Sequence, residues 1–209
     1  KLNLLKNKNS LFFKNNDELK EEYCNFTSMR NLYVGNNCSE LLNKLILQIK
    51  PKNNIKTNIY LPAYFCGQSL RFLRNINIRI NFYKLTDELL PDYHHLKKLS
   101  LKNKVDVFLL VHYFGKIKGQ EEASLFARNN KSILIEDCTH LISPILLKKS
   151  YGDFLIFSPY KHFNIPPIGL LFSKEKLDII SHYTKQNKTW FLKMILKRLF
   201  SYKSNTSWG

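Results

Sequence analysis

Residues 105–112, Val-Asp-Val-Phe-Leu-Leu-Val-His, form a dense apolar run that leaves few folds open to this chain. A strand of this composition is typical of a sheet whose two faces are both covered. Other short apolar runs precede and follow it, and segments with helical spacing lie between several of them. This alternation predicts an α/β fold with a mixed, mostly parallel sheet flanked by helices.

The expected elements follow from apolar periodicity and from the polar residues that bound each run. A helix at 38–49 carries leucine and isoleucine at helical spacing, and Asn37 or Ser39 can cap it. The other predicted helices are 68–74, 92–99 and 121–128. The predicted strands are 58–61, 76–83, 105–112 and 132–135, and a further strand in the run 151–163. A chain of this length suits one domain, or one large domain with a fragment of another.

Two of the predicted strands end in chemically useful residues. The run 132–140 leads into Glu136 and Asp137, and the run 151–163 leads into Ser158 and Lys161. Binding sites in such sheets lie beyond the carboxyl ends of the strands. There a lysine amine can form a Schiff base with the aldehyde of pyridoxal phosphate (PLP), while an aspartate keeps the ring nitrogen protonated. The pair Lys161 and Asp137 predicts a PLP site, although a solvated lysine and a capping aspartate would give the same pattern.

The chain is strongly basic, with 33 Lys and Arg against 16 Asp and Glu and a formal net charge of +17. An excess of this size is compatible with binding to nucleic acid or to an anionic membrane surface. The basic residues are, however, spread along the chain among many asparagines, and the sequence contains no RNA-recognition or zinc-finger pattern. We therefore expect a solvated basic surface that favours anionic substrates such as nucleotide sugars, and no nucleic-acid partner.

The cysteines and the apolar runs indicate neither a metal site nor a membrane span. Cys24, Cys38, Cys66 and Cys138 form no C-x-x-C pair and no Cys/His set with zinc spacing. Free thiols are the default in a reducing cytosol, so we expect a cytoplasmic protein. No apolar run approaches the roughly 20 residues that cross a bilayer.

Six short segments, taken in order, resemble signatures of the DegT/StrS-type sugar aminotransferases, which have the fold-type-I PLP architecture. They are Tyr-Val-Gly-Asn-Asn at 33–37, Leu-Pro-Ala-Tyr-Phe-Cys at 61–66, Asn-Phe-Tyr at 81–83, Val-His-Tyr-Phe-Gly at 111–115, Ile-Glu-Asp-Cys-Thr-His at 135–140 and Phe-Ser-Pro-Tyr-Lys at 157–161. The resemblance implies an N-terminal segment at 1–29, a PLP-binding large domain at 30–175, and a helical connector at 176–209. That connector would lead toward a small C-terminal domain that is largely absent from the chain.

The resemblance also implies roles for the matching residues around the cofactor ring. Lys161 corresponds to the Schiff-base lysine that moves protons between substrate and cofactor. Asp137 corresponds to the partner of the ring nitrogen, and His140 to a polar side chain near the phenolic oxygen. The family's stacking aromatic falls on Cys66 by strict counting, with Tyr64 and Phe65 directly before it.

Four more residues correspond to the family's phosphate site. Ser158 would donate its hydroxyl to the cofactor phosphate. The backbone amides of Gly35, Asn36 and Asn37 would surround the same phosphate at the start of a helix, where anions bind readily. Gly-Asn-Asn is also common turn chemistry, so an ordinary turn is the alternative.

The activity implied by the resemblance is transamination. Glutamate would supply the amino group, and a keto-sugar carried on a nucleotide would receive it, for polysaccharide or lipopolysaccharide synthesis. Such enzymes are homodimers with residues donated across the interface. Some members carry histidine in place of the lysine and dehydrate sugars instead, so Lys161 favours transamination.

The sequence departs from the family pattern at two places, and two rival interpretations stay open. The family's Gly-Gly pair downstream of the lysine is Pro-Pro-Ile-Gly at 166–169, and the phosphate loop lacks the usual Gly-Thr or Gly-Arg pair. The first rival is a degenerate, non-catalytic member that keeps the fold as a binding module. The second is a basic α/β protein that binds nucleic acid.

Overall fold

The computed structural model describes residues 29–49, 56–74, 76–147, 149–163 and 165–179. The expected segment at 1–29 and the connector at 176–209 lie almost entirely outside these residues. The division into domains therefore stays a prediction.

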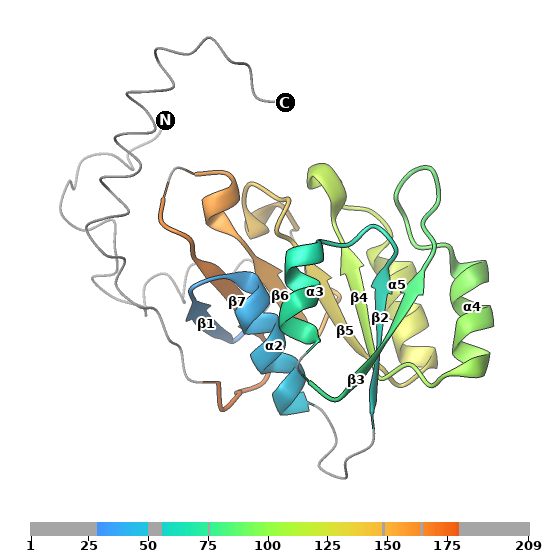
Figure 1. The fold of residues 1–209 in the computed structure, drawn as a ribbon. Helices are drawn as coiled ribbons and strands as arrows, with labels where there is room; N and C mark the ends of the chain where they lie inside the picture. Colours follow the sequence, from blue (N-terminus) through green and yellow to red (C-terminus); the bar gives the residue numbers. More distant parts are fainter. Residues whose placement is uncertain (1–28, 50–55, 75, 148, 164, 180–209) are drawn as a thin grey trace, which may run out of the picture.

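In the described part of the chain, seven strands form a single sheet (Figure 1). They are β1 (Asn31–Gly35), β2 (Thr57–Pro62), β3 (Ile78–Tyr83), β4 (Val107–Val111), β5 (Ile133–Asp137), β6 (Phe154–Phe157) and β7 (Gly169–Ser173). Their order in space is β1-β7-β6-β5-β4-β2-β3, and β7 runs antiparallel to both of its neighbours while the other pairs are parallel. The predicted mixed, mostly parallel sheet is confirmed.

Helices cover both faces of this sheet. Figure 1 shows α2 (Cys38–Ile49) and α3 (Gly67–Leu73) on one face, with α4 (Tyr93–Lys102) and α5 (Gln120–Asn129) on the other. Each of these helices lies within a few residues of its predicted range. Short 3-10 turns, η1 (Tyr113–Gly115), η2 (Pro144–Leu147) and η3 (Pro159–Lys161), follow β4, β5 and β6.

The start of α2 shows how the sequence directs local structure. The side-chain oxygen of Asn37 accepts a hydrogen bond from the Glu40 N–H at 2.8 Å, which confirms Asn37 as the cap. The helix buries Leu41 and Leu45 completely against the sheet. Gly35 ends β1 directly beneath it, and a Cβ there would lie 2.8 Å from Leu41 Cγ, so any other residue would displace this buried leucine side chain.

The central strands explain why the apolar run at 105–112 is so dense. Every residue of β4 is buried. Leu109 and Val111 pack into the core beneath α2 and α3, whereas Phe108 and Leu110 pack beneath α4 and α5. Successive side chains alternate between the two faces of a strand. The side chains of adjacent residues at a strand end therefore also lie on opposite faces of the sheet.

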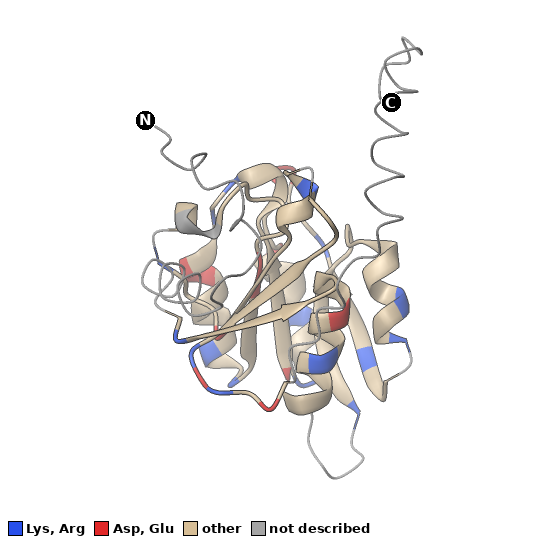
Figure 2. Ribbon diagram, turned by 90° about the vertical axis from the view of Figure 1, so that its left-hand side faces the viewer, with Lys and Arg blue, Asp and Glu red and all other residues tan. Residues whose placement is uncertain are grey.

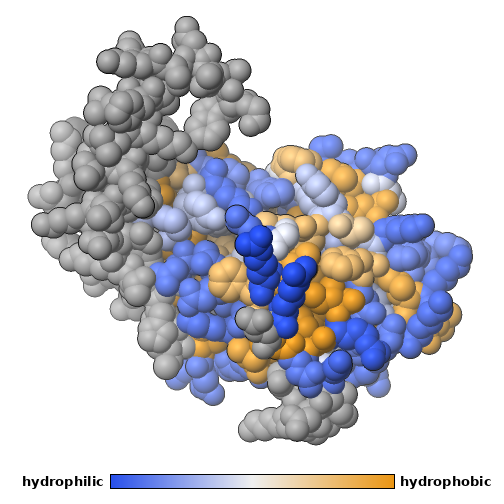
Figure 3. Space-filling view, viewed as in Figure 1, coloured by the Kyte–Doolittle hydropathy of each residue, from blue (hydrophilic) through white to orange (hydrophobic). Residues whose placement is uncertain are grey.

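The surface combines scattered charge with limited apolar exposure. In Figure 2 the basic positions lie on several helices, strands and turns, with acidic positions among them. Figure 3 shows an apolar patch in the middle of the face that carries α2 and α3, surrounded by hydrophilic surface. Within the described residues, no helix is long and apolar enough to cross a membrane.

Candidate functional site

A cavity of about 250 Å³ opens at the carboxyl edge of the sheet, beside the first turns of α2 and α3. Its walls come from segments far apart in the chain: both helix starts, the ends of β4, β5 and β6, and the turns that follow them. Seven of the nine residues singled out from the sequence line it, namely Asn37, Tyr64, Phe65, Asp137, His140, Ser158 and Lys161. The fold therefore brings these residues together, and their binding roles stay predictions.

The other two singled-out residues lie beside the cavity without lining it. Gly35 is the last residue of β1 and packs under Leu41. The Asn36 side chain donates to Glu40 Oε2 at 3.3 Å, on the first turn of α2. The wall at this helix start consists instead of Asn37, Cys38 and Ser39.

Asp137 is the last residue of β5, and its side chain is 7% exposed. Its Oδ1 accepts a hydrogen bond from the Thr139 N–H at 2.9 Å. The strand pairs on either side hold the backbone, since Asp137 lies opposite Val111 of β4 and Ile156 of β6. Asp137 is thus a nearly buried carboxylate on a rigid element, directed at the cavity.

Lys161 ends the 3-10 turn η3, four residues after β6. Its backbone N–H donates to the Ser158 carbonyl at 3.2 Å, which closes the turn. Its Nζ donates to Thr139 Oγ1 at 3.2 Å, so the amine reaches across to the loop that follows β5. Ser158 lies beneath it and is 1% exposed. Lys161 is exposed and lines the cavity, and the Thr139 hydroxyl holds its amine.

Aromatic rings form one rim of the cavity. Tyr64 is exposed and stacks on Tyr113 with 5.6 Å between ring centroids, and the Tyr113 hydroxyl donates to the Tyr64 carbonyl. His140 meets the Tyr113 ring edge-on at 6.0 Å. Burial lowers the pKa of His140, and the charge of Lys161 lowers it further, so the imidazole is neutral at neutral pH. Neutral imidazole can both donate and accept one hydrogen bond.

Two thiols in the wall differ in character. Burial and the nearby Asp137 carboxylate raise the pKa of Cys38 to about 12, so this thiol stays protonated. Burial raises the pKa of Cys66 too, but hydrogen bonds from the start of α3 and the charge of Lys161 outweigh it, and the net shift is downward. Cys66 thus occupies the position at which the family pattern has a stacking ring, and it adds a polarisable sulfur to the wall.

The start of α2 is closely packed against β7. A Cβ on Gly169 would lie 2.4 Å from the Asn37 carbonyl carbon and 2.5 Å from the Cys38 nitrogen, so no side chain fits there. The glycine of the Pro-Pro-Ile-Gly stretch therefore permits a close backbone approach to the start of α2. This packing fixes the first turn of a twelve-residue helix at the cavity wall.

The donor set of this cavity fits PLP. The Lys161 amine and the Asp137 carboxylate line it together with the start of α2 and the buried Ser158 hydroxyl, where a phosphate group can bind. The described residues contain no group of three or more His, Cys, Asp or Glu that could hold a metal ion.

The sequence matches no family model and no curated protein. Solved structures match the fold. Helicobacter pylori PseC, an aminotransferase involved in the biosynthesis of pseudoaminic acid, gives a TM-score of 0.65 at 16% identity over 76% of this chain and 44% of that chain. Bacillus subtilis NtdA with bound cofactor PMP gives a TM-score of 0.64 at 15% identity, over 77% of this chain and 37% of that chain. A DegT/DnrJ/EryC1/StrS aminotransferase from Brucella abortus gives a TM-score of 0.62 at 13% identity, over 92% of this chain and 51% of that chain.

The chain thus has the large-domain fold of fold-type-I PLP aminotransferases and spans about half the length, or less, of these three proteins. At 13–16% identity the likeness establishes the fold, and the activity has to be argued from the site.

The sequence interpretation gave no role to Thr139, although this residue makes important contacts in the site. It joins the Asp137 carboxylate to the Lys161 amine. Its position was visible as a hydroxyl residue two places after the acid, at a strand end where polar residues serve function more often than packing.

Proposed function

We propose that this chain is the cofactor-binding part of a PLP-dependent aminotransferase that aminates a keto-sugar carried on a nucleotide. One observation carries the proposal: Asp137 and Lys161, from the ends of two adjacent parallel strands, line the same cavity as the start of α2. The fold shared with sugar aminotransferases supports it. A basic surface suits a substrate that carries phosphates.

In this proposal each residue has a distinct task. PLP supplies an electron sink that stabilises negative charge next to the reacting nitrogen. Lys161 would attach to its aldehyde, and its released amine would move a proton at the substrate carbon. Asp137 would face the ring nitrogen and hold a proton there, because its carboxylate is nearly buried and is directed at the cavity. His140, neutral at the rim, would lie near the phenolic oxygen.

The phosphate would bind at the start of α2, beside Ser158. The first turn of α2, with Asn37 at its start, presents the positive end of a helix dipole. Ser158 would donate its hydroxyl from beneath. Tyr64 and Phe65 lie at the rim, where an aromatic ring can cover a planar ligand. Gly35 and Asn36 would act indirectly, by placing α2.

Partners and location belong to the same proposal. Glutamate is the proposed amino donor, and the protein would work in the cytoplasm. A homodimer would complete the site. The exposed apolar side chains Leu47 of α2 and Phe72 of α3, on the face with the apolar patch of Figure 3, support a protein contact there.

The rival interpretations have less support. Dispersed basic residues give no continuous stripe for a nucleic-acid backbone in the view of Figure 2. A degenerate member has no reason to keep a lysine, a carboxylate and a buried hydroxyl around one cavity. The transaminase proposal therefore fits the site best.

The proposal is tested by the two halves of the reaction. Protein is mixed with PLP and desalted, and its visible spectrum is recorded before and after addition of glutamate. We expect a retained yellow band that disappears with glutamate, as the amino group moves to the cofactor, and a Lys161→Ala variant that retains no such band while keeping its circular dichroism spectrum. A wild-type band that glutamate leaves unchanged would contradict transamination with this donor.

A further inference from the structure

Thr139 contacts both residues on which the proposed function depends. Its N–H donates to Asp137 Oδ1 at 2.9 Å, and its Oγ1 accepts from Lys161 Nζ at 3.2 Å. Its carbonyl oxygen lies 3.2 Å from His162 Nε2. The residue is 6% exposed and lines the cavity. One buried threonine thus touches the acid, the lysine and the residue after the lysine.

The backbone around Thr139 is held in place. The Cys138 N–H donates to the Ile156 carbonyl of β6 at 2.8 Å, and the Leu141 N–H donates back to the Cys138 carbonyl at 3.0 Å. These bonds tie the loop after β5 to the strand that leads into Lys161. The backbone of Thr139 therefore has a fixed place relative to β6, independent of any ligand.

A hydroxyl is chemically suited to hold a lysine that must react. No ion pair between described residues includes Lys161. A carboxylate partner would favour the charged ammonium form, whereas a neutral acceptor perturbs that equilibrium less. Only the uncharged amine attacks a carbonyl, and a released amine must stay within reach of the reacting atoms.

We propose that Thr139 is a positioning residue whose hydroxyl holds the Lys161 amine in the cavity that Asp137 also lines, whenever the lysine is not covalently engaged. The inference rests on the proposed function, because it assigns this task to the amine that would react with the cofactor. It makes Thr139 the link between the ends of β5 and β6.

The test measures the reactivity of Lys161 without any cofactor. Cofactor-free protein is treated with formaldehyde and cyanoborohydride, which methylate lysine amines, and the rate at Lys161 is compared by peptide mass spectrometry with that at Lys97, an exposed lysine of α4. Thr139→Val removes the hydroxyl and keeps the N–H contact to Asp137, whereas Thr139→Ser keeps both. Thr57→Val is the matched control, since Thr57 is 2% exposed and its hydroxyl has no partner among described residues.

In Thr139→Val we expect the Lys161 rate, relative to Lys97, to rise roughly three- to tenfold, the size expected when one hydrogen bond to the amine is lost. Thr139→Ser and Thr57→Val should stay within about twofold of wild type, because neither breaks that bond. Circular dichroism checks folding, and Thr139→Ala replaces the valine variant if that one does not fold. An unchanged ratio in the variant that lacks the hydroxyl, or an equal rise in Thr57→Val, would overturn the proposal.

This experiment separates the two proposals. A wild-type protein that retains no PLP, but shows the expected labelling pattern, would remove the proposed cofactor function and leave the positioning of Lys161 intact. A protein that retains PLP on Lys161, but labels equally with and without the Thr139 hydroxyl, would remove the positioning role alone.

Discussion

Glu136 and Asp137 are adjacent acids at the end of β5, yet they lie on opposite faces of the sheet in very different surroundings. Glu136 is fully buried on the α4–α5 face, and its carboxylate accepts five hydrogen bonds, from Gln120 Nε2 (2.7 Å), His112 Nε2 (2.8 Å), Ser150 Oγ (2.9 Å), Tyr151 N (2.7 Å) and Gly152 N (2.6 Å). Asp137 accepts a hydrogen bond from the Thr139 N–H and faces the cavity.

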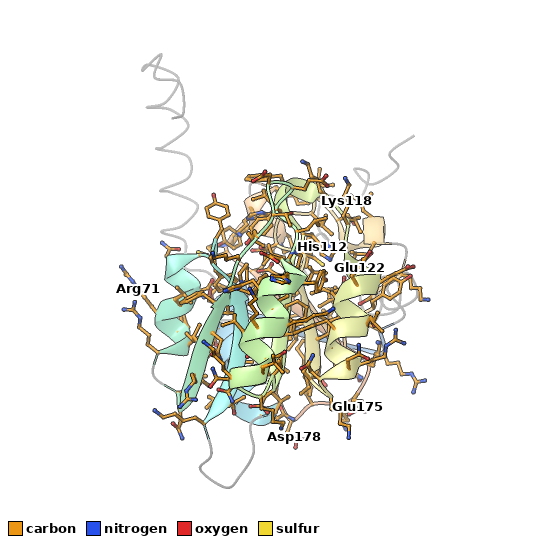
Figure 4. The ribbon with its side chains drawn as sticks, turned by 90° about the vertical axis from the view of Figure 1, so that its right-hand side faces the viewer. Arg71, His112, Lys118, Glu122, Glu175 and Asp178 are labelled. Atoms are coloured by element: carbon orange, nitrogen blue, oxygen red, sulfur yellow. The ribbon has the colours of Figure 1, made fainter. Side chains whose placement is uncertain are left out.

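Glu136 therefore has a structural role, which we call the anchor, whereas Asp137 belongs to the candidate binding site. The carboxylate of Glu136 has its acceptor capacity filled by protein donors, so it stabilises the turn at 150–152 against β5. Burial raises the pKa of Glu136, but its hydrogen bonds, that from His112 first, lower the pKa overall. Figure 4 shows His112 inside the fold, near the end of α5 that carries Glu122. Asp137 keeps acceptor capacity directed at the cavity, which is what a ligand requires.

The largest expected difference between the two acids is in stability. Glu136→Ala leaves buried donors without an acceptor and should lower the free energy of unfolding by about 3–5 kcal/mol. Asp137→Ala should cost about 1 kcal/mol or less, because it leaves a single backbone N–H beside an open cavity. Urea denaturation of both variants measures this. Equal losses would remove the distinction between anchor and site.

The next largest expected effect is the loss of stability when Gly169, on the cavity side of the sheet, is replaced. Gly169→Ala should destabilise the protein by about 1–3 kcal/mol, because its Cβ would meet backbone atoms of Asn37 and Cys38. The matched change Gly67→Ala introduces a Cβ with nothing within 4 Å, at the first residue of α3, and should be neutral or slightly stabilising. Thermal melting of the two variants measures this difference in stability. A harmless Gly169→Ala would mean that the start of α2 is not held by β7.

The two acids should also differ in their effect on cofactor affinity. This difference is smaller, and here the change at Asp137 has the larger effect. Asp137→Asn should weaken PLP retention by about tenfold, or roughly 1.4 kcal/mol, because a neutral amide cannot compensate the charge of a protonated ring nitrogen. Glu136→Gln should change it by less than about twofold, measured at temperatures where the variant is folded. The measurement is a PLP titration followed by absorbance. Equal weakening by both substitutions would contradict the assignment of the site to one face.

The smallest expected effect is on pH dependence. Because the pKa of Glu136 is lowered in the folded protein, its contribution to stability is fully present above the ordinary glutamate value of 4.5 and is lost as the pH falls through the lowered value. Wild type should therefore lose more stability than Glu136→Gln on going from pH 7 to below that range. Denaturation midpoints at several pH values report it, and parallel pH profiles would show that Glu136 is not held as a carboxylate.

Most of the sheet could be predicted from the sequence, because strands that are buried on both faces leave long apolar runs such as 105–112. The cap at Asn37 was readable for a similarly local reason. The antiparallel strand β7 and its partner β1 were not predicted as strands. Their pairing joins residues about 140 positions apart, such as Asn31 with Ser173, and no local pattern encodes such a pair.

The candidate site was predictable where a residue lies at a strand end and less so where a turn decides its direction. Asp137 and Lys161 follow apolar runs, and both reach the cavity. Gly35 and Asn36 were grouped with Asn37 because the segment 33–37 resembles a phosphate-binding loop, but of these three only Asn37 lies in the wall. Thr139 gained its importance from a contact across 22 residues of sequence, which spacing alone does not reveal.

The most direct test of the account is to find which lysine carries the cofactor. Protein is loaded with PLP, reduced with borohydride, digested and analysed by mass spectrometry for the peptide that carries the label. The account predicts bleaching of the yellow band and a single labelled residue, Lys161, in wild type and in Glu136→Gln. A label on another lysine, or one spread over many surface lysines, would contradict the placement of the site at the end of β6.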